Sequence, residues 1–309
     1  MDIPVELRSD PPRSTLEWIA GHFEAGAQVT GIRRMRNAWA AAVHALDVDD
    51  ATGTRHELVL RRWARVDLET DVGVVENEAA VLTFLESCAP GFVAPRLVIS
   101  DPDATSADVP ALVMTRLPGR DDLTPADVDV YLDGLVTTLR AIHAAPVPDH
   151  ALGDYFPWGL DDLTDPPPWT RRPDVWLRAF EIARRPVPAY RPVLCHRDFH
   201  PGNVLWQEGR VTGVVDWTST CRGPVACDVA HCRNNLALLF GLEVADDFAR
   251  RYGPVDDLAW FDVVDVVGWG DLDTWRWHEA GRPDISDDTV IRAADDFLAA
   301  AVARVAGLD

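Results

Sequence analysis

Three side chains around one predicted turn have the types and spacing of a magnesium–nucleotide site. The sequence predicts a strand on each side of Gln207–Gly209, with the second strand at 210–215. In an antiparallel hairpin with this turn, Asn203 at the start of the first strand lies opposite Asp216 at the end of the second. Two such oxygen ligands suit Mg²⁺ when phosphate oxygens share its coordination. Asp198 precedes this pair, and its carboxylate is available to accept a hydroxyl proton.

Composition and charge exclude several classes of protein. The chain has 29 basic and 50 acidic residues and a net charge of −21, so it should repel nucleic acid and anionic membranes. It contains no lysine, which excludes lysine Schiff-base chemistry and the lysine-dependent Walker loop. No long apolar run or secretory signal is present, and the odd set of five cysteines is typical of a reducing compartment. We therefore expect a cytoplasmic protein with neither nucleic acid nor membrane as a partner.

Hydrophobic periodicity predicts a β-rich half followed by a mostly helical half. The long segment 152–173 is predicted to be a packed loop, because it is rich in aromatic residues. Strands are predicted at 28–35, 39–48, 57–63, 95–100 and 111–116, and helices at 74–87, 125–144, 174–184, 226–240, 245–252, 256–267 and 289–305.

The segment 196–203, with the sequence HRDFHPGN, resembles the catalytic loop of protein kinases. Together with the downstream sequence VDW at 215–217, it is most similar to the aminoglycoside phosphotransferase and choline kinase superfamily. The resemblance implies an α+β, two-lobed, protein-kinase-like fold. Its N-terminal lobe, with an antiparallel sheet, one helix and the hinge, would cover 1–117, and its helical lobe would cover 118–309.

The same resemblance implies roles for five residues of the helical lobe. Asp198 would be the catalytic base, and His196 would support the loop that carries it. Asn203 and Asp216 would bind Mg²⁺. Asp228 would anchor the backbone of the catalytic loop.

Upstream residues resemble the nucleotide-binding parts of these kinases in the expected order. Arg61 stands where the family's phosphate-binding lysine is usual, and it keeps the positive charge. Glu78 is similar to the helix glutamate that pairs with this cation. The segment 113–119 resembles the hinge, so that Met114, Thr115 and Leu117 would lie against the adenine base.

The loop that would cover the phosphates departs from the kinase pattern. The segment 34–39 has no glycine, although kinases use a glycine-rich turn there, and it leaves the contacts of Arg36 and Asn37 open.

Two other functions compete with phosphoryl transfer. Cysteines and histidines crowd 195–232 and could suggest a metal site, but their spacing matches no paired C-x-x-C pattern, and buried thiols explain them better. A non-catalytic nucleotide-binding protein, a pseudokinase, is the second alternative. Such a protein would be expected to lose the base or a metal ligand, whereas this chain keeps Asp198, Asn203 and Asp216.

The acceptor is predicted from acidic and aromatic residues of the C-terminal helices. Asp262, Asp265 and Trp269 fall near one helical face, and this combination suits a cationic acceptor, although solvated helix faces are the alternative explanation. The predicted reaction transfers the terminal phosphoryl group of ATP or GTP, with Mg²⁺, to a hydroxyl of an aminoglycoside-like or other basic natural product. Choline, homoserine or a sugar is the alternative acceptor.

Overall fold

The computed structural model describes residues 4–35, 41–64, 68–147, 152–160, 163–268, 272 and 274–307. The chain divides into two compact units. The first comprises Met1–Ala89, Val93–Pro118 and Gly213–Ser219, and the second comprises Pro90–Phe92, Gly119–Thr212 and Thr220–Asp309. The segment Gly213–Ser219, which carries Asp216, thus belongs to the first unit although it lies far along the sequence.

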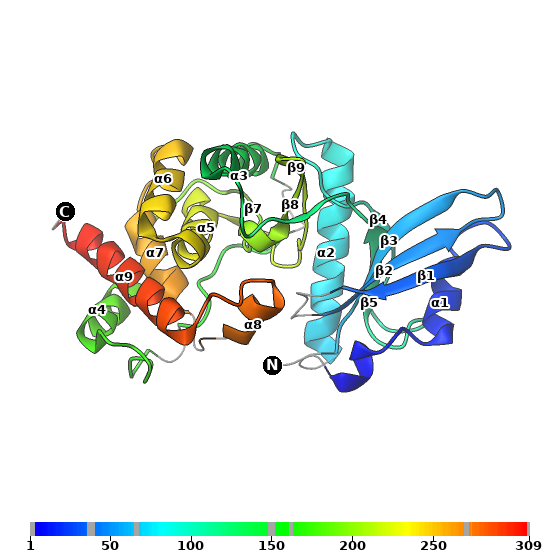
Figure 1. Cartoon of the computed structure of the whole chain (residues 1–309), viewed down its shortest axis with the longest axis horizontal. Helices are drawn as coiled ribbons and strands as arrows, with labels where there is room; N and C mark the ends of the chain where they lie inside the picture. Colours follow the sequence, from blue (N-terminus) through cyan, green and yellow to red (C-terminus); the bar gives the residue numbers. More distant parts are fainter. Residues whose placement is uncertain are drawn as a thin grey trace. The chain divides into compact units, whose positions relative to one another are not determined.

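The first unit is built on a five-stranded antiparallel sheet (Figure 1). The strand order is β1-β2-β3-β5-β4, so the predicted antiparallel N-terminal sheet is confirmed. The strands are β1 (Gln28–Arg34), β2 (Ala42–Asp49), β3 (Arg55–Arg62), β4 (Leu97–Asp101) and β5 (Ala111–Thr115).

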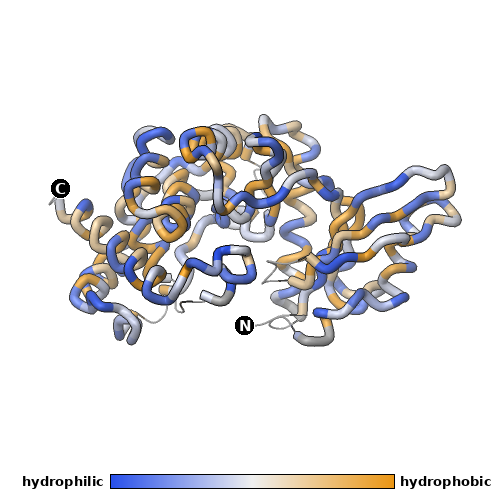
Figure 2. The backbone as a smooth tube through the Cα atoms, in the orientation of Figure 1, coloured by the Kyte–Doolittle hydropathy of each residue, from blue (hydrophilic) through white to orange (hydrophobic). Residues whose placement is uncertain are grey.

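One face of this sheet carries buried apolar side chains, and Arg61 lies on the opposite face. Leu46 pairs with Leu58, and Leu60 pairs with Val113, so these side chains share one face and form a buried cluster. Figure 2 shows hydrophobic and hydrophilic residues alternating along the strands. Because successive side chains point to opposite faces, Arg61 lies on the other face from Leu58 and Leu60.

Three helical segments accompany the sheet. Helix α2 (Leu68–Cys88) packs against β4 and β5 and begins six residues before the predicted start at Val74. Its sequence explains the difference, because Asp71 already places an acidic residue in the first turn. Helix α1 (Arg13–Ala20), which was not predicted, packs against β1, and the short 3₁₀ helix η1 (Val5–Arg8) precedes it.

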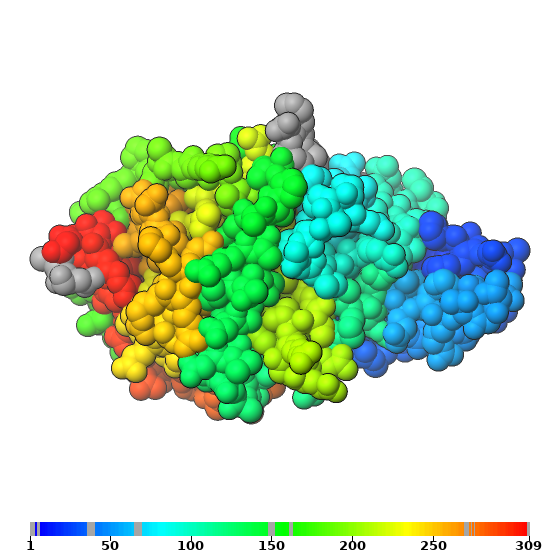
Figure 3. All heavy atoms as spheres, turned by 90° about the horizontal axis from the view of Figure 1, so that it is seen from above, coloured from blue at the N-terminus to red at the C-terminus, as the bar shows by residue number. Residues whose placement is uncertain are grey.

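The second unit is mostly helical, as predicted. Helix α5 is central, because it packs against α6, α7 and α9, and Figure 3 shows α3 beside α6 on one face. None of the helices in the described ranges has the length and apolar character needed to cross a bilayer. The helices are α3 (Val128–His143), α4 (Pro173–Ala183), α5 (Val225–Phe240), α6 (Leu242–Tyr252), α7 (Leu258–Val267), α8 (Thr274–Glu279) and α9 (Asp287–Ala306).

Short strands frame the catalytic segment. The predicted hairpin is formed by β8 (Val204–Gln207) and β9 (Arg210–Val214), in a three-stranded sheet of order β6-β8-β9. The sequence analysis did not identify β6 (Arg120–Asp121), β7 (Val193–Cys195), β10 (Cys221–Gly223) or α8. Each of them has two to six residues, which is too short for a clear hydrophobic period.

The packing of α3 against β8 yields a stability prediction. A Cβ atom added at Gly134 would lie 2.4 Å from Cη2 of Trp206, whose ring stacks on Tyr131. We therefore expect Gly134→Ala to lower the free energy of unfolding by about 1–3 kcal/mol, as overpacking does in a filled core. Urea denaturation would measure the change.

Gly73, within α2, is the matched control, because nothing lies within 4 Å of its added Cβ. Gly73→Ala should raise the free energy of unfolding by roughly 0.5–1 kcal/mol through helix propensity. Equal effects of the two substitutions would contradict the close approach at Gly134.

Candidate active site

Asp228 holds the backbone of the segment that resembles a kinase catalytic loop. Its side chain is fully buried at the start of α5 and accepts the amide of His196 at 2.9 Å and that of Arg197 at 2.6 Å. His143 of α3 bonds the same carboxylate through Nε2 at 3.0 Å. Burial alone would raise the pKa of Asp228, but His143, His196 and the Arg197 amide hold it below its usual value. This is the contact that the resemblance implies for Asp228.

Arg197 adopts a backbone conformation that needs support. Its φ of 73° lies in the left-handed region, which is unfavourable for a residue with a side chain. The guanidinium stacks over the rings of Tyr155 at 4.2 Å and Trp158 at 4.0 Å, and it donates to the Phe156 carbonyl. The aromatic residues of the predicted packed loop therefore surround a residue of the catalytic segment.

Asp198 is held by hydrogen bonds on both of its carboxylate oxygens. The side-chain amide of Asn203 donates to Oδ2 and to the main-chain carbonyl of Asp198, at 2.9 Å each. His231 approaches Oδ1 through Nε2 at 3.1 Å, and the Asp198 amide donates to Nδ1 of His196 at 3.3 Å. The Asp198 side chain remains 31% exposed, so a solute can reach it.

Neighbouring histidines lower the pKa of the Asp198 carboxyl group. Burial alone would raise the pKa of its carboxyl group, but His200, His231 and His196 outweigh burial and hold the pKa well below its usual range. Asp198 is therefore a carboxylate at neutral pH, as a residue that accepts a hydrogen bond from a hydroxyl must be.

In the first unit, Arg61 lies between two carboxylates. Its guanidinium donates to Oε1 of Glu78 at 2.6 Å and to Oδ1 of Asp216 at 2.9 Å. Both Arg61 and Glu78 are buried. Burial raises the pKa of Glu78 to about 7 against the opposing effect of Arg61. The structure thus brings Arg61 together with Glu78, its predicted partner, and with Asp216, a predicted magnesium ligand.

Asp216 keeps an oxygen that could bind a metal. It has a φ of 67°, and its Oδ1 accepts from Arg61 and from the Thr218 hydroxyl, the latter at 2.8 Å. Within the described part of the chain Oδ2 has no hydrogen-bond donor, and the side chain is 29% exposed. Asn203 likewise donates through its amide nitrogen, which leaves the amide oxygen as its ligand atom. A carboxylate and an amide oxygen fit the preference of Mg²⁺ for oxygen ligands.

The predicted hinge residues lie at the end of β5. Met114 is buried and pairs with Val59 of β3, and the Thr115 amide donates to the Arg96 carbonyl at 2.9 Å. Leu117 follows the strand, and its Cδ1 lies 2.3 Å from the position that a Cβ on Gly213 would take. Their contacts with a nucleotide remain a proposal.

The predicted acceptor residues have different surroundings. Asp262 is fully buried and ion-paired with Arg233, and burial raises its pKa to about 6. Its side chain has no exposed surface in this conformation, so a role for Asp262 in acceptor binding stays a prediction. Asp265 is 16% exposed and bonds His231. Trp269 lies outside the described residues, as do Arg36 and Asn37.

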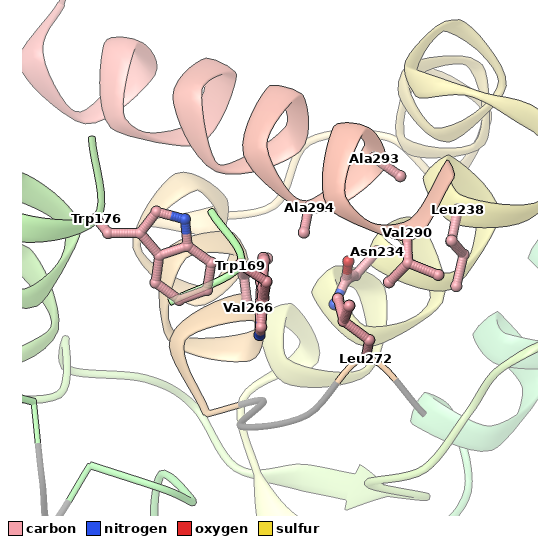
Figure 4. Close-up of a pocket in the computed structure, with 9 residues that line it drawn as sticks. All are labelled: Trp169, Trp176, Asn234, Leu238, Val266, Leu272, Val290, Ala293 and Ala294. Carbon is pink, nitrogen blue, oxygen red and sulfur yellow. The ribbon is translucent and has the colours of Figure 1, made fainter. Parts of the chain in front are cut away.

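A small apolar cavity lies in the second unit beside Asn234. Its volume of about 20 Å³ has room for roughly one water molecule, which is too little for an acceptor. Figure 4 shows the side chains around it, with two alanines contributed by α9. They are Trp169, Trp176, Asn234, Leu238, Val266, Leu272, Val290, Ala293 and Ala294.

The buried thiols of the described residues do not form the metal cluster weighed from the sequence. Burial raises the pKa of Cys195, Cys227 and Cys232, which keeps them as neutral thiols. One grouping with metal-like spacing occurs there, and it combines Cys195 with His143 and Asp228. Its atoms already have protein partners, since the Cys195 thiol donates to a carbonyl and the other two residues bond each other.

Sequence reasoning missed the role of His231. It considered this residue only as a member of a metal cluster, whereas the structure places it against Asp198. A signal was available, because Asp228 and His231 are three residues apart in a predicted helix and therefore lie on one face. His143 left no such signal, since its contact with Asp228 joins helices far apart in the sequence.

A family model describes the greater part of the chain. The model of a phosphotransferase enzyme family matches residues 41–264, a span that contains the Arg61 cluster and the catalytic segment. The chain belongs to this family. No curated protein matches the sequence of this phosphotransferase.

Solved structures of other phosphotransferases share the fold. A thermostable mutant of aminoglycoside phosphotransferase APH(4)-Ia, in ternary complex with AMP-PNP and hygromycin B, is 17% identical, with a TM-score of 0.62 over 96% of this chain and 100% of that chain. Macrolide 2′-phosphotransferase MphH from Brachybacterium faecium is 19% identical, with a TM-score of 0.56 over 92% of this chain and 97% of its own. The structural similarity covers almost the whole of this chain and supports the predicted protein-kinase-like fold.

The Arg61 cluster generates a second stability prediction. Arg61→Met should lower the free energy of unfolding by about 3–5 kcal/mol, because Glu78 would lose the cation that pairs with its buried carboxyl group. Adding Glu78→Gln should restore part of that loss, since the second substitution removes the uncompensated charge. Urea denaturation of both variants would measure this coupling. Additive losses would contradict the pairing.

Proposed function

We propose that this phosphotransferase transfers the terminal phosphoryl group of ATP or GTP to a hydroxyl of a small molecule, foremost an aminoglycoside-like or other basic natural product. The observation that carries the proposal is the state of Asp198. It is an ionised carboxylate, partly exposed, held by Asn203 and His231 at the end of an anchored loop. A hydroxyl that donates to this carboxylate would be oriented for attack.

The chain's own residues supply the remaining functions. Asn203 and Asp216 would hold Mg²⁺, which supplies positive charge to the phosphates when it is bound. Arg61 would orient the phosphates, with Glu78 and Asp216 fixing its guanidinium. Met114, Thr115 and Leu117 would bind the adenine or guanine base.

Atoms and charge balance in the proposed transfer. The acceptor oxygen forms a bond to the terminal phosphorus, and the bond from this phosphorus to the bridging oxygen breaks. The nucleoside diphosphate leaves with the electrons of the broken bond, and the hydroxyl proton passes to Asp198. A weakly basic carboxylate suits a loose transition state, in which orienting the hydroxyl contributes more than early removal of its proton.

The negative net charge of the protein supports a cationic acceptor, whereas the pairing of two predicted acceptor-site aspartates within the protein supports a neutral one. The net charge of −21 attracts cations and suits a protein that encounters basic antibiotics, in a role of antibiotic inactivation or self-protection in the cytoplasm. The pairing of Asp262 with Arg233 and of Asp265 with His231 occupies two carboxylates that could otherwise bind a cationic acceptor. That pairing favours the second candidate, a metabolic alcohol such as choline, homoserine or a sugar, and within that set a neutral sugar.

A nucleotide-consumption screen tests the proposal. Purified protein would be incubated with Mg²⁺ and ATP or GTP, and with a panel of aminoglycosides, macrolides, choline, homoserine and sugars. We expect turnover with at least one acceptor, a product heavier by one phosphoryl group in mass spectrometry, and loss of turnover after chelation of Mg²⁺. Nucleotide binding without turnover across the panel would support a pseudokinase instead.

A further inference from the structure

We propose that His231, clamped by Asp265, is a positioning residue that fixes the carboxylate of Asp198 toward the acceptor hydroxyl. The inference rests on the proposed function of Asp198. It adds to the phosphotransferase a residue pair that lies outside the motif of the catalytic segment.

Both ring nitrogens of His231 face carboxylate oxygens. Nε2 lies 3.1 Å from Oδ1 of Asp198, and Nδ1 lies 2.9 Å from Oδ1 of Asp265. A carboxylate only accepts hydrogen bonds, so a ring that bonds to both must donate from both nitrogens. The geometry therefore describes a carboxylate–imidazolium–carboxylate chain that ends at the proposed catalytic residue.

The second carboxylate of this chain is itself fixed. The side-chain amide of Asn234 donates to Oδ2 of Asp265 at 2.8 Å, while His231 occupies Oδ1. His231 and Asn234 are three residues apart on α5, so both reach Asp265 on α7 from the same face. Asp265 thus holds the ring in one orientation.

The surroundings of His231 favour its positive charge. Burial would lower the pKa of the imidazole, but Asp265 and Asp198 outweigh burial and raise the pKa to about 10. The other titratable ring beside it is that of His200, whose centroid lies 5.7 Å away. The side chain of His231 is 13% exposed, which limits screening by water. The ring is therefore a cation throughout the neutral pH range.

Two donors together determine how the Asp198 carboxylate is turned. His231 bonds Oδ1 and Asn203 bonds Oδ2, so rotation of the carboxylate plane would break both contacts. Each oxygen can still accept one further hydrogen bond, which leaves room for the acceptor hydroxyl. Loss of His231 should therefore disturb the orientation of Asp198 more than the binding of nucleotide.

A purely structural role is the competing explanation, in which His231 would only tie α5 to α7. A second pair already joins these helices, because Arg233 of α5 bonds Asp262 of α7. Arg233 also bonds Asp246 of α6, which is 31% exposed and whose ion-pair partners among the described residues are Arg233 and Arg304. Asp246→Asn therefore weakens an ion pair of the same helix without touching Asp198.

Steady-state kinetics on a working acceptor separate the two explanations. We expect His231→Ala and Asp265→Asn to lower kcat by about 10–100-fold, the usual effect of losing a residue that orients a functional group, with nucleotide KM changed less than about twofold. His231→Gln should recover part of kcat, because its amide can donate to Asp198. Asp246→Asn should leave kcat and KM unchanged.

The comparison of the two His231 variants provides a readout that helix packing alone would not move. If His231 only packed α5 against α7, His231→Ala and His231→Gln should change kcat and nucleotide KM together, with no recovery in the variant that can donate to Asp198. Unchanged kcat in His231→Ala, or equal losses of kcat in the two variants, would overturn the proposal.

Histidine side-chain NMR distinguishes failure of this inference from failure of the proposed function, because it needs no acceptor. The His231 signal, assigned by its loss in His231→Gln, should report a protonated ring at pH 8. Asp198→Asn and Asp265→Asn should each lower its pKa. A neutral His231 ring at pH 7 overturns the inference even if phosphoryl transfer occurs. A protonated ring whose pKa falls in Asp198→Asn, in a protein that transfers no phosphoryl group, supports the pairing and contradicts the proposed function.

Discussion

The buried carboxylate of Asp228 is the interaction on which the catalytic segment depends. It binds two successive main-chain amides, and one of them belongs to Arg197, whose left-handed φ would otherwise be costly. His143 of α3 bonds the same carboxylate. Because the next residue is Asp198, the position of the proposed catalytic carboxylate follows from this anchor. His231, one helical turn along α5 from Asp228, then fixes the side chain that the anchor has placed.

Other buried carboxylates of the protein are paired with arginine side chains. The chain has 50 acidic residues and no lysine, so any side-chain cation that neutralises a buried acid must be arginine or histidine. A guanidinium can bond two carboxylates at once, as Arg61 does with Glu78 and Asp216, and as Arg233 does with Asp246 and Asp262. Arg61 therefore supplies one positive charge to two carboxylates and is fixed by both contacts.

Local patterns in the sequence were sufficient to predict the sheet and the long helices. The helical spacing in α3 reflects burial on one side, because its buried residues recur at intervals of three and four. Short elements such as β7 and α8 were not predicted, because they depend on pairing and packing partners that are distant in sequence.

Contacts of the site could be predicted where the two residues are close in the sequence, because the local backbone then sets the distance between them. Asp198 and Asn203 belong to one short loop, and their contact follows from that loop. Burial is decided by tertiary packing, so sequence gave no sign that Asp262 is enclosed with Arg233 while Asp265 meets His231. Helical spacing showed that Asp262 and Asp265 lie near one face of a helix, but it could not show that Arg233 and His231 are their partners.

We propose that two carboxylates have different roles, with Asp216 serving metal and nucleotide and Asp198 serving the acceptor hydroxyl. Calorimetric titration of Asp198→Asn and Asp216→Asn with a magnesium–nucleotide complex tests it most directly. We expect Asp216→Asn to weaken magnesium-dependent nucleotide binding, whereas Asp198→Asn should bind nearly normally and lose about 10²–10⁴-fold in kcat. Loss of nucleotide binding in Asp198→Asn together with full binding and activity in Asp216→Asn would contradict the account.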